Sequence, residues 1–192
     1  MPRKKSYEDN DVIEKATELF WRNGYQNTSM SLLESTMGIN KFSIYASFGS
    51  KQGVFIASLQ AYRTLHSTAI IKLKQSNQGL MAIKTFFYDC LDIYHDTDCS
   101  KGCLMSNTRA QLNNHKETKI LAEIQSFVDY QRQLFIDKLL EHGLDQSTAV
   151  KQANYLIITK QSISAASKVH PIEQVHDYIE FTFNAISATH TH

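Results

Sequence analysis

The chain has 192 residues, a net charge of +1 and a hydrophobic content of 42%, with only 7 glycines and 2 prolines. This composition excludes a disordered or collagen-like chain and favours a compact, mainly helical protein of one or two domains. No apolar run approaches the roughly 20 residues that span a bilayer, and the N-terminus lacks the apolar core of a signal peptide, so we expect no membrane association and a cytoplasmic location. Three cysteines, an odd number, favour reduced thiols over a disulfide framework.

A first helix is predicted for residues 9–23. Ile13, Ala16 and Phe20 recur at helical spacing, and Gly24 follows as a helix stop. Acidic residues in the opening turns suit the positive end of the helix dipole. We expect this helix to support the segment that follows it.

Residues 28–48 are predicted to form two short helices around a tight turn. Thr28 would cap the first helix, Gly38 would end it, and Asn40 would cap the second. Ile44 and Phe48, four residues apart, would anchor the second helix on its inner side. This arrangement is a helix-turn-helix, whose second helix fits the major groove of DNA.

The run from Leu19 to Phe55 resembles the N-terminal DNA-binding domain of TetR-type transcriptional regulators. The matching positions are Phe20, Gly24, Tyr25, Thr28, Gly38, Ile44, Tyr45, Phe48 and Lys51. The resemblance implies an all-α homodimer that binds a palindromic double-stranded DNA operator. It also implies a pocket for an unknown small-molecule effector, without a cofactor or a metal.

Eight side chains are candidate DNA contacts. Those expected at phosphates are Thr28, Tyr45, Ser47 and Lys51, and those expected at base edges are Lys41, Phe42, Ser43 and Ala46. Lys41 can donate to guanine, while Phe42 and Ala46 can contact a thymine methyl group. Phe42 departs from the family, where a small residue is commoner, so no operator preference is transferred. Because this side has no Arg, Gln or base-facing Asn, we expect a substantial contribution from DNA shape.

Basic residues dominate the segment between residues 22 and 74. Glu34 is the only acidic residue there, against Arg22, Lys41, Lys51, Arg63, Lys72 and Lys74. Charge runs usually form a solvated surface, but on a helix-turn-helix the same excess can neutralise phosphates.

The rest of the chain is predicted to be helical throughout. A long helix at 50–75 would connect a DNA-binding domain, 1–49, to a ligand-binding and dimerisation domain, 76–192. Further helices are expected at 80–94, 103–113, 118–142, 146–168 and from Pro171 onward. These predictions add up to nine helices.

The last two predicted helices are candidates for a dimer interface. Intramolecular packing explains one apolar stripe per helix, but small residues permit a close approach of helices. Tyr178, Phe181 and Phe183 leave apolar surface beyond one stripe. The resemblance implies a four-helix contact between two copies, as suits a reader of two half-sites.

Candidate effector contacts are the aromatic and sulfur-containing residues of the second domain, although residues at such helical spacing are more often plain core than ligand contacts. They are Phe86, Phe87, Cys90, Tyr94, Met105, Phe127, Tyr130 and Tyr155.

The run from Lys101 to Met105 resembles a glycine-cysteine-leucine element of one branch of these regulators, some of which sense electrophiles or oxidants. This implies sensing at Cys103. A thiol in the first turn of a helix beside Lys101 would have a stabilised thiolate. The alternative is a small buried thiol that only packs.

The sequence allows three other interpretations. His95, Asp96, Asp98, Cys99 and Cys103 could suggest a metal site, but the segment is polar and no second compact pair completes it. A cysteine enzyme would pair Cys103 with His95 or His115, a combination that occurs by chance in many proteins. A protein-binding regulator without DNA binding is disfavoured by Tyr45 and Lys51. We therefore predict a ligand- or stress-responsive repressor that is not an enzyme.

Overall fold

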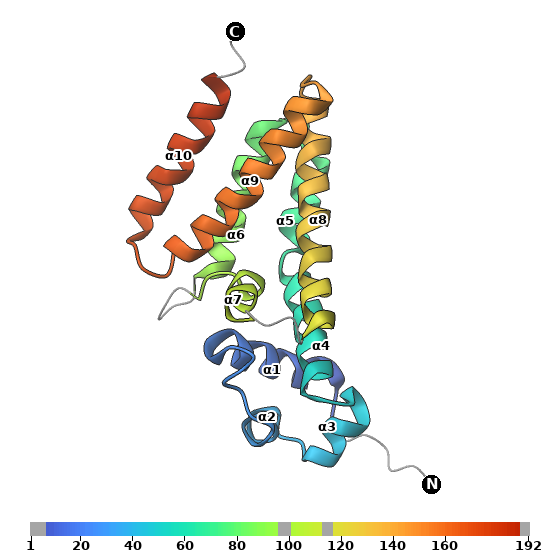
Figure 1. Cartoon of the computed structure of the whole chain (residues 1–192). Coiled ribbons are helices and arrows are strands. Elements are labelled where there is room, and N and C mark those ends of the chain that lie inside the picture. The colour runs from blue at the N-terminus through green and yellow to red at the C-terminus, as the bar shows by residue number, and fades with distance from the viewer. Residues whose placement is uncertain (1–6, 96–100, 113–116, 189–192) are drawn as a thin grey trace.

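The computed structural model describes residues 7–95, 101–112 and 117–188, and in these ranges it is all-helical, with ten helices and no strand (Figure 1). The all-α fold class is thus confirmed. The helices are α1 (Asp9–Asn23), α2 (Met30–Met37), α3 (Lys41–Phe48), α4 (Lys51–Leu65), α5 (Ser67–Gln75), α6 (Leu80–Tyr94), α7 (Leu104–Gln111), α8 (Thr118–Glu141), α9 (Gln146–Ala166) and α10 (Ile172–Ala188).

The predicted helix 50–75 is wrong in one respect, because it is two helices that meet at His66. The backbone N–H of His66 donates to the carbonyl of Arg63, a tighter turn than in an α-helix, and the His66 ring is buried. The apolar stripe continues across this break, so its spacing could not reveal it. The structure therefore has ten helices where nine were predicted.

The lower end of the molecule in Figure 1 consists of α1, α2, α3 and the first turns of α4. The Phe55 ring of α4 packs edge-on against Phe20 of α1, with 4.7 Å between ring centroids. Gly53 lets α4 begin close to the end of α3, because a Cβ there would lie 1.8 Å from the Phe48 carbonyl oxygen. These contacts fix the orientation of α3.

Of the two predicted N-caps, Asn40 is confirmed and Thr28 is wrong. Asn40 accepts the N–H of Ser43 at the start of α3, and Ser50 accepts the N–H of Gly53 at the start of α4. The cap of α2 is Ser29, whose hydroxyl accepts the N–H of Leu32 at 3.1 Å. Thr28 is fully buried instead and donates to the Gly24 carbonyl at 2.8 Å.

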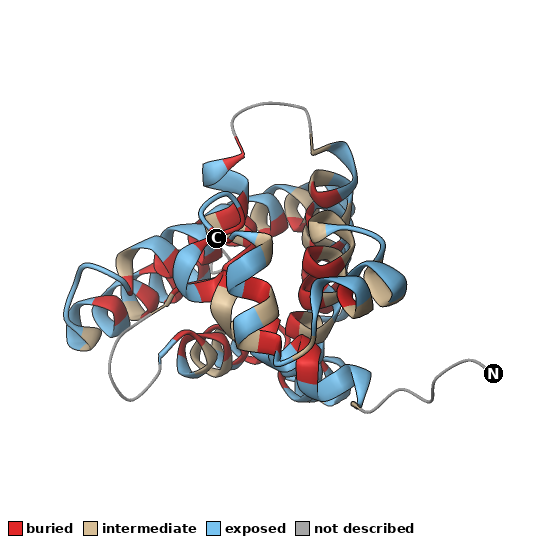
Figure 2. Cartoon of the chain, turned by 90° about the horizontal axis from the view of Figure 1, so that it is seen from below, coloured by how far each residue is buried: buried red, intermediate tan, exposed pale blue. Residues whose placement is uncertain are grey.

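The upper part of the molecule is formed by α5 to α10 together with the end of α4 (Figure 1). Seen from below, the helices turn buried faces toward one another and exposed faces to solvent (Figure 2). Ala149 and Ala153 are fully buried on α9, which packs along α8. Phe183, predicted to leave surplus apolar surface, is buried against Phe87 with 5.1 Å between the ring centroids.

Buried side chains form one cluster that extends from Val12 to Ile186. The domain boundary after residue 49 therefore stays a prediction, because packing is continuous across it. None of the described helices is both long enough and apolar enough to cross a membrane.

Candidate nucleic-acid interface and effector pocket

The outward side of α3 stands clear of the rest of the molecule. Phe42 is 82% exposed and Tyr45 is 50% exposed, although both are large aromatic side chains. Lys41 and Ala46 are exposed as well, while Ile44 is fully buried and holds the helix from behind. An exposed aromatic side chain contributes little to the stability of the fold. Its position on the outward side of α3 suits a helix that enters a DNA groove.

Two polar side chains of α3 are already held by neighbouring elements. The Lys41 ammonium lies 3.0 Å from the Ser31 hydroxyl and 3.9 Å from the Glu34 carboxylate of α2. The half-buried Ser47 hydroxyl lies 2.9 Å from that of Tyr7. These contacts restrict the side chains, so less conformational entropy is lost when they meet a ligand.

Lys51, at the start of α4, is half-buried rather than free. Its ammonium lies 4.5 Å from the centroid of the Tyr25 ring and 3.4 Å from the Gln26 carbonyl oxygen. Burial lowers the pKa of Lys51, and the nearby Glu117 opposes that shift. Glu117 precedes α8 and accepts a hydrogen bond from Gln52 at 2.6 Å. The start of α8 thus contacts the DNA-facing end of α4, which no sequence pattern indicated.

Thr28 is the one predicted DNA contact that the structure removes, because its hydroxyl is buried and hydrogen-bonded inside the protein. The neighbouring Ser29 is exposed at the N-terminus of α2. Either hydroxyl suits an N-cap, so the sequence could not choose between them.

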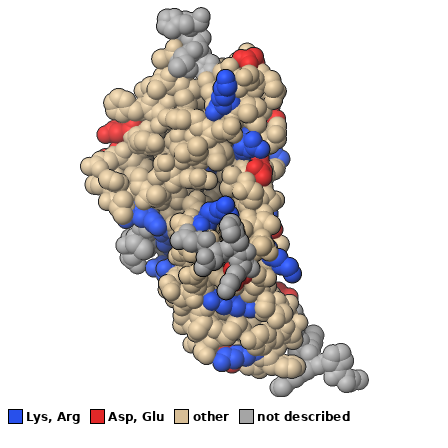
Figure 3. Space-filling model, in the orientation of Figure 1, with Lys and Arg blue, Asp and Glu red and all other residues tan. Residues whose placement is uncertain are grey.

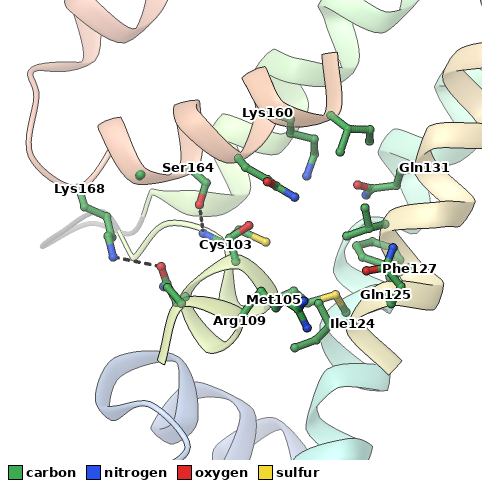
Figure 4. Close-up of a pocket in the computed structure, with 17 residues that line it drawn as sticks. Cys103, Met105, Arg109, Ile124, Gln125, Phe127, Gln131, Lys160, Ser164 and Lys168 are labelled. Atoms are coloured by element: carbon green, nitrogen blue, oxygen red, sulfur yellow. Dashed lines mark hydrogen bonds between the residues drawn. The ribbon is translucent and has the colours of Figure 1, made fainter. Parts of the chain in front are cut away.

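A cavity of about 410 Å³ lies between α7, α8 and α9, a volume in the usual range for small-molecule sites (Figure 4). Among the residues singled out for the second domain, only Cys103, Met105 and Phe127 line it. The other candidates do not line this cavity, because aromatic spacing identifies a buried face and not a hollow one. Phe86, Phe87, Cys90 and Tyr94 are core residues that do not line it, whereas Tyr130 and Tyr155 are exposed outside it.

Cys103 caps the N-terminus of α7 with its backbone, and its N–H donates to the Ser164 hydroxyl at 2.7 Å (Figure 4). Burial raises the pKa of the Cys103 thiol, but Lys160 and the polar groups of Tyr62 and Ser106 outweigh burial, so the pKa lies below its ordinary value. The buried Cys90 thiol differs, since burial raises its pKa to about 12. Of the two, Cys103 is the thiol suited to react.

The cation expected beside Cys103 was misassigned. The Lys101 ammonium turns away to α1, where it lies 2.9 Å from the Glu18 carboxylate and 4.3 Å from the centroid of the Trp21 ring. Lys160, fifty-seven residues further along the chain, supplies the positive charge instead. Local sequence could not reveal this, because α9 reaches Cys103 only in the folded protein.

Residues 101–103 join the pocket to α1. The Trp21 indole N–H donates to the Gly102 carbonyl at 2.9 Å, and the next residue is Cys103 in the pocket wall. Gly102 has a φ of +64°, and a Cβ there would lie 2.7 Å from the Ser164 carbonyl oxygen. Glycine is therefore required at this point of close approach.

The alternative metal site cannot be assembled from the described residues. Asp96, Asp98 and Cys99 of that site lie outside them, as does His115 of the alternative cysteine enzyme, and within them no three His, Cys, Asp or Glu side chains are placed to hold a metal ion.

Comparison with known proteins places this chain among regulators. Residues 12–58 match the family model of bacterial regulatory proteins, tetR family. The chain is 22% identical, over 97% of its length and all of the relative, to an HTH-type transcriptional regulator of Bacillus subtilis (strain 168), YezE, named as uncharacterized. It is 28% identical over 115 residues to the HTH-type transcriptional repressor ComR of Escherichia coli (strain K12), which covers 58% of this chain and 54% of that protein.

The fold agrees with a solved structure of the TetR family transcriptional regulator CifR, a cysteine mutant complexed with a 26bp operator DNA. The TM-score is 0.85 at 20% identity, covering 95% of this chain and 99% of that one. The exposed α3 and these matches define a helix-turn-helix DNA-binding transcriptional regulator and not an enzyme. Residues 12–58 are thus similar to the DNA-binding part of the tetR family, and the chain as a whole has the fold of a solved TetR-family regulator.

Proposed function

We propose that the protein is a ligand- or stress-responsive repressor that binds a palindromic operator as a homodimer and leaves it on a small-molecule or electrophile signal. The observation that carries this proposal is the position of residues 101–103, which contact the pocket on one side and α1 on the other. A change in the pocket can thereby alter the support of the helix-turn-helix. The repressor role also fits the similarity to ComR, an HTH-type transcriptional repressor.

In this proposal α3 enters the major groove. Lys41, Phe42, Ser43 and Ala46 meet base edges, and Tyr45, Ser47 and Lys51 meet phosphates, with Ser29 in place of Thr28. The small number of hydrogen-bonding base contacts leaves DNA shape as a substantial source of specificity.

The homodimer is proposed to form through α9 and α10. These helices expose large apolar side chains although each already buries a stripe within the chain. The exposed side chains are Tyr155, Ile158, Tyr178 and Phe181. A two-fold axis between two such helix pairs would present two copies of α3 to two half-sites.

The electrophile branch of the proposal rests on Cys103. The Cys103 thiolate would add to the C=C double bond of an acceptor such as N-ethylmaleimide, so that a carbon–sulfur bond forms, the π bond breaks and the neighbouring carbon takes a proton from water. The added group would lie in the pocket wall, one residue from the carbonyl that binds Trp21. The added volume would press on α7 and on its contact with α1.

The test measures operator binding by the full-length protein at several salt concentrations, before and after treatment with N-ethylmaleimide. We expect affinity to fall with salt, and treatment to release the operator from the native protein but not from Cys103→Ser. Cys99→Ser is the control and should release normally. Release from Cys103→Ser would refute the electrophile branch, and affinity that does not depend on DNA sequence would refute the regulator itself.

The same assay checks the interface. Lys51→Ala should weaken binding to every sequence alike, because a phosphate contact carries no base information. Lys74→Ala, at an exposed site on α5 away from the DNA-binding end, is the matched control and should bind normally. A change of sequence preference in Lys51→Ala would contradict its assignment.

A further inference from the structure

The charge of the pocket wall is one-sided. Three cationic side chains, Arg109, Lys160 and Lys168, line the cavity, and none of its lining residues is an aspartate or a glutamate. Apolar side chains such as Ile124, Val128 and Ile157 form the rest of the wall together with neutral amides. The cavity therefore combines apolar surface with excess positive charge.

Lys160 is the deepest of the three cations and lacks a carboxylate partner in the described part of the chain. It is 7% exposed, and the hydrogen bond of its ammonium goes to the neutral Tyr94 hydroxyl at 2.9 Å. Lys138 is similarly buried but has a counter-ion, because its ammonium lies 2.6 Å from the Glu141 carboxylate. A buried ammonium without a counter-ion is costly, and an anion at that place would offset the cost.

Gln131 supplies a second polar group aimed into the same space. It is 3% exposed on α8, and its Nε2 is buried without a hydrogen-bond partner in the described residues. Figure 4 shows Gln131 and Lys160 pointing into the cavity from the facing helices α8 and α9. An unpaired buried amide N–H is uncommon in a folded protein, and it can donate a hydrogen bond to an accepting group of a bound ligand.

We propose that this pocket binds a small organic monoanion with an apolar body, such as an aromatic or branched carboxylate, whose anionic group lies between Lys160 and Gln131. The apolar body packs against Phe127 and its aliphatic neighbours. The inference rests on the effector pocket proposed above and adds the chemical class of its ligand. Bound there, the anion competes with the Cys103 thiolate for the charge of Lys160.

The test is calorimetric titration of the full-length protein, without DNA, with three carboxylates and the amide of each. The probes are 2-naphthoate, 3-phenylpropanoate and octanoate, each paired with its primary amide. We expect at least one carboxylate to bind about tenfold or more tightly than its amide, as a charge-assisted hydrogen bond predicts. If no pair shows a preference for the carboxylate, or if no probe binds, the inference is wrong.

Substitutions test whether Lys160 and Gln131 cause the preference for the carboxylate over its amide. Lys160→Met and Gln131→Glu should each abolish the preference for the carboxylate, the first by removing the cation and the second by placing a carboxylate opposite it. Lys74→Met, at an exposed site on α5 outside the cavity, should leave it unchanged. Circular dichroism checks that each variant folds. Gln131→Glu replaces the side chain with one of the same shape, so this variant still provides the test if Lys160→Met does not fold. A preference that survives in both variants would overturn the assignment.

A second readout separates this inference from the repressor proposal. The preferred carboxylate should slow the alkylation of Cys103 by iodoacetamide several-fold, whereas its amide should not. Binding and protection that occur without operator release would contradict the repressor proposal alone. If a neutral effector releases the operator and no carboxylate is preferred over its amide, the proposal of an anionic ligand is wrong and the repressor proposal is not affected.

Discussion

His66 is a single residue that divides a long helix and stays uncharged while doing so. Its ring lies 4.7 Å from that of Tyr62 and 5.7 Å from that of Phe127, measured between centroids. Burial lowers the pKa of His66 from 6.5 to about 3, with a further contribution from the nearby Lys160 ammonium. The hydrogen bond to the Tyr62 carbonyl opposes this shift and is too weak to reverse it.

This shift makes stability depend on pH in a defined direction. Below pH 6.5 His66 becomes protonated in the unfolded chain but stays neutral in the folded protein. The free energy of unfolding therefore falls as the pH decreases below 6.5. This contribution of His66 to stability is lost progressively as the pH falls from 6.5 toward about 3. Urea unfolding at fixed protein concentration should show it between about pH 6.5 and 5, above the range where ordinary carboxylates titrate.

Two variants isolate that contribution. His66→Leu removes the titrating group and should flatten the pH dependence in this window. His170→Gln, at an exposed site, should retain it. An unchanged slope in His66→Leu would show that another group is responsible.

At the scale of elements, α7 and the residues before it act as the connection between pocket and DNA-binding end. Besides Trp21 and Lys101, the contact includes Gln111, whose backbone carbonyl lies 3.5 Å from the Gln26 amide. The start of α8 adds the contacts of Glu117 with Tyr25 and Gln52. Two elements of the upper part therefore hold α1 and α4 directly.

The Trp21 contact can be weakened with one substitution. Trp21→Phe keeps an aromatic ring but leaves the Gly102 carbonyl without its donor, which should lower the free energy of unfolding by about 1–3 kcal/mol. It should also reduce the ratio of operator Kd values measured with and without N-ethylmaleimide. Glu14→Gln, exposed on the same helix, is the control. An undiminished ratio in Trp21→Phe would place the connection elsewhere.

At the scale of the whole molecule, charge is distributed differently from what the basic segment alone indicated. Arg63 pairs with Glu123 of α8 at 2.7 Å, and Lys72 pairs with Asp89 of α6 at 3.0 Å. Figure 3 shows Lys and Arg on the lower part of this face as separate patches and not as a continuous stripe. Much of the basic excess is thus neutralised inside the molecule, which leaves the α3 end with few free charges.

The proposed dimer is the other whole-molecule property open to test. Phe181 is 78% exposed on α10. Phe181→Glu should raise the dimer dissociation constant at least about thirtyfold, the effect of losing an interface hot spot of about 2 kcal/mol. Sedimentation velocity over a concentration series measures this. Ile71→Glu, at an exposed apolar site on α5, is the control and should not change the dimer dissociation constant. If Phe181→Glu leaves that constant unchanged, α10 is not part of the interface.

Several features of this protein were determined by the sequence alone. The helix-turn-helix, the cap at Asn40 and the end of α2 at Gly38 all follow from neighbouring residues, because caps and helical spacing act within a few positions. The outward side of α3 followed for the same reason, since Ile44 identifies the buried side of so short a helix.

Only the tertiary structure decided which buried faces enclose a cavity and which fill the core. Cys103, Gln131 and Lys160 come from three helices and meet only after folding, and the break at His66 exists because α6 and α8 surround its ring. A helical period shows that a stripe is buried and not what it is buried against. Contacts between distant elements therefore had to be observed in the folded protein.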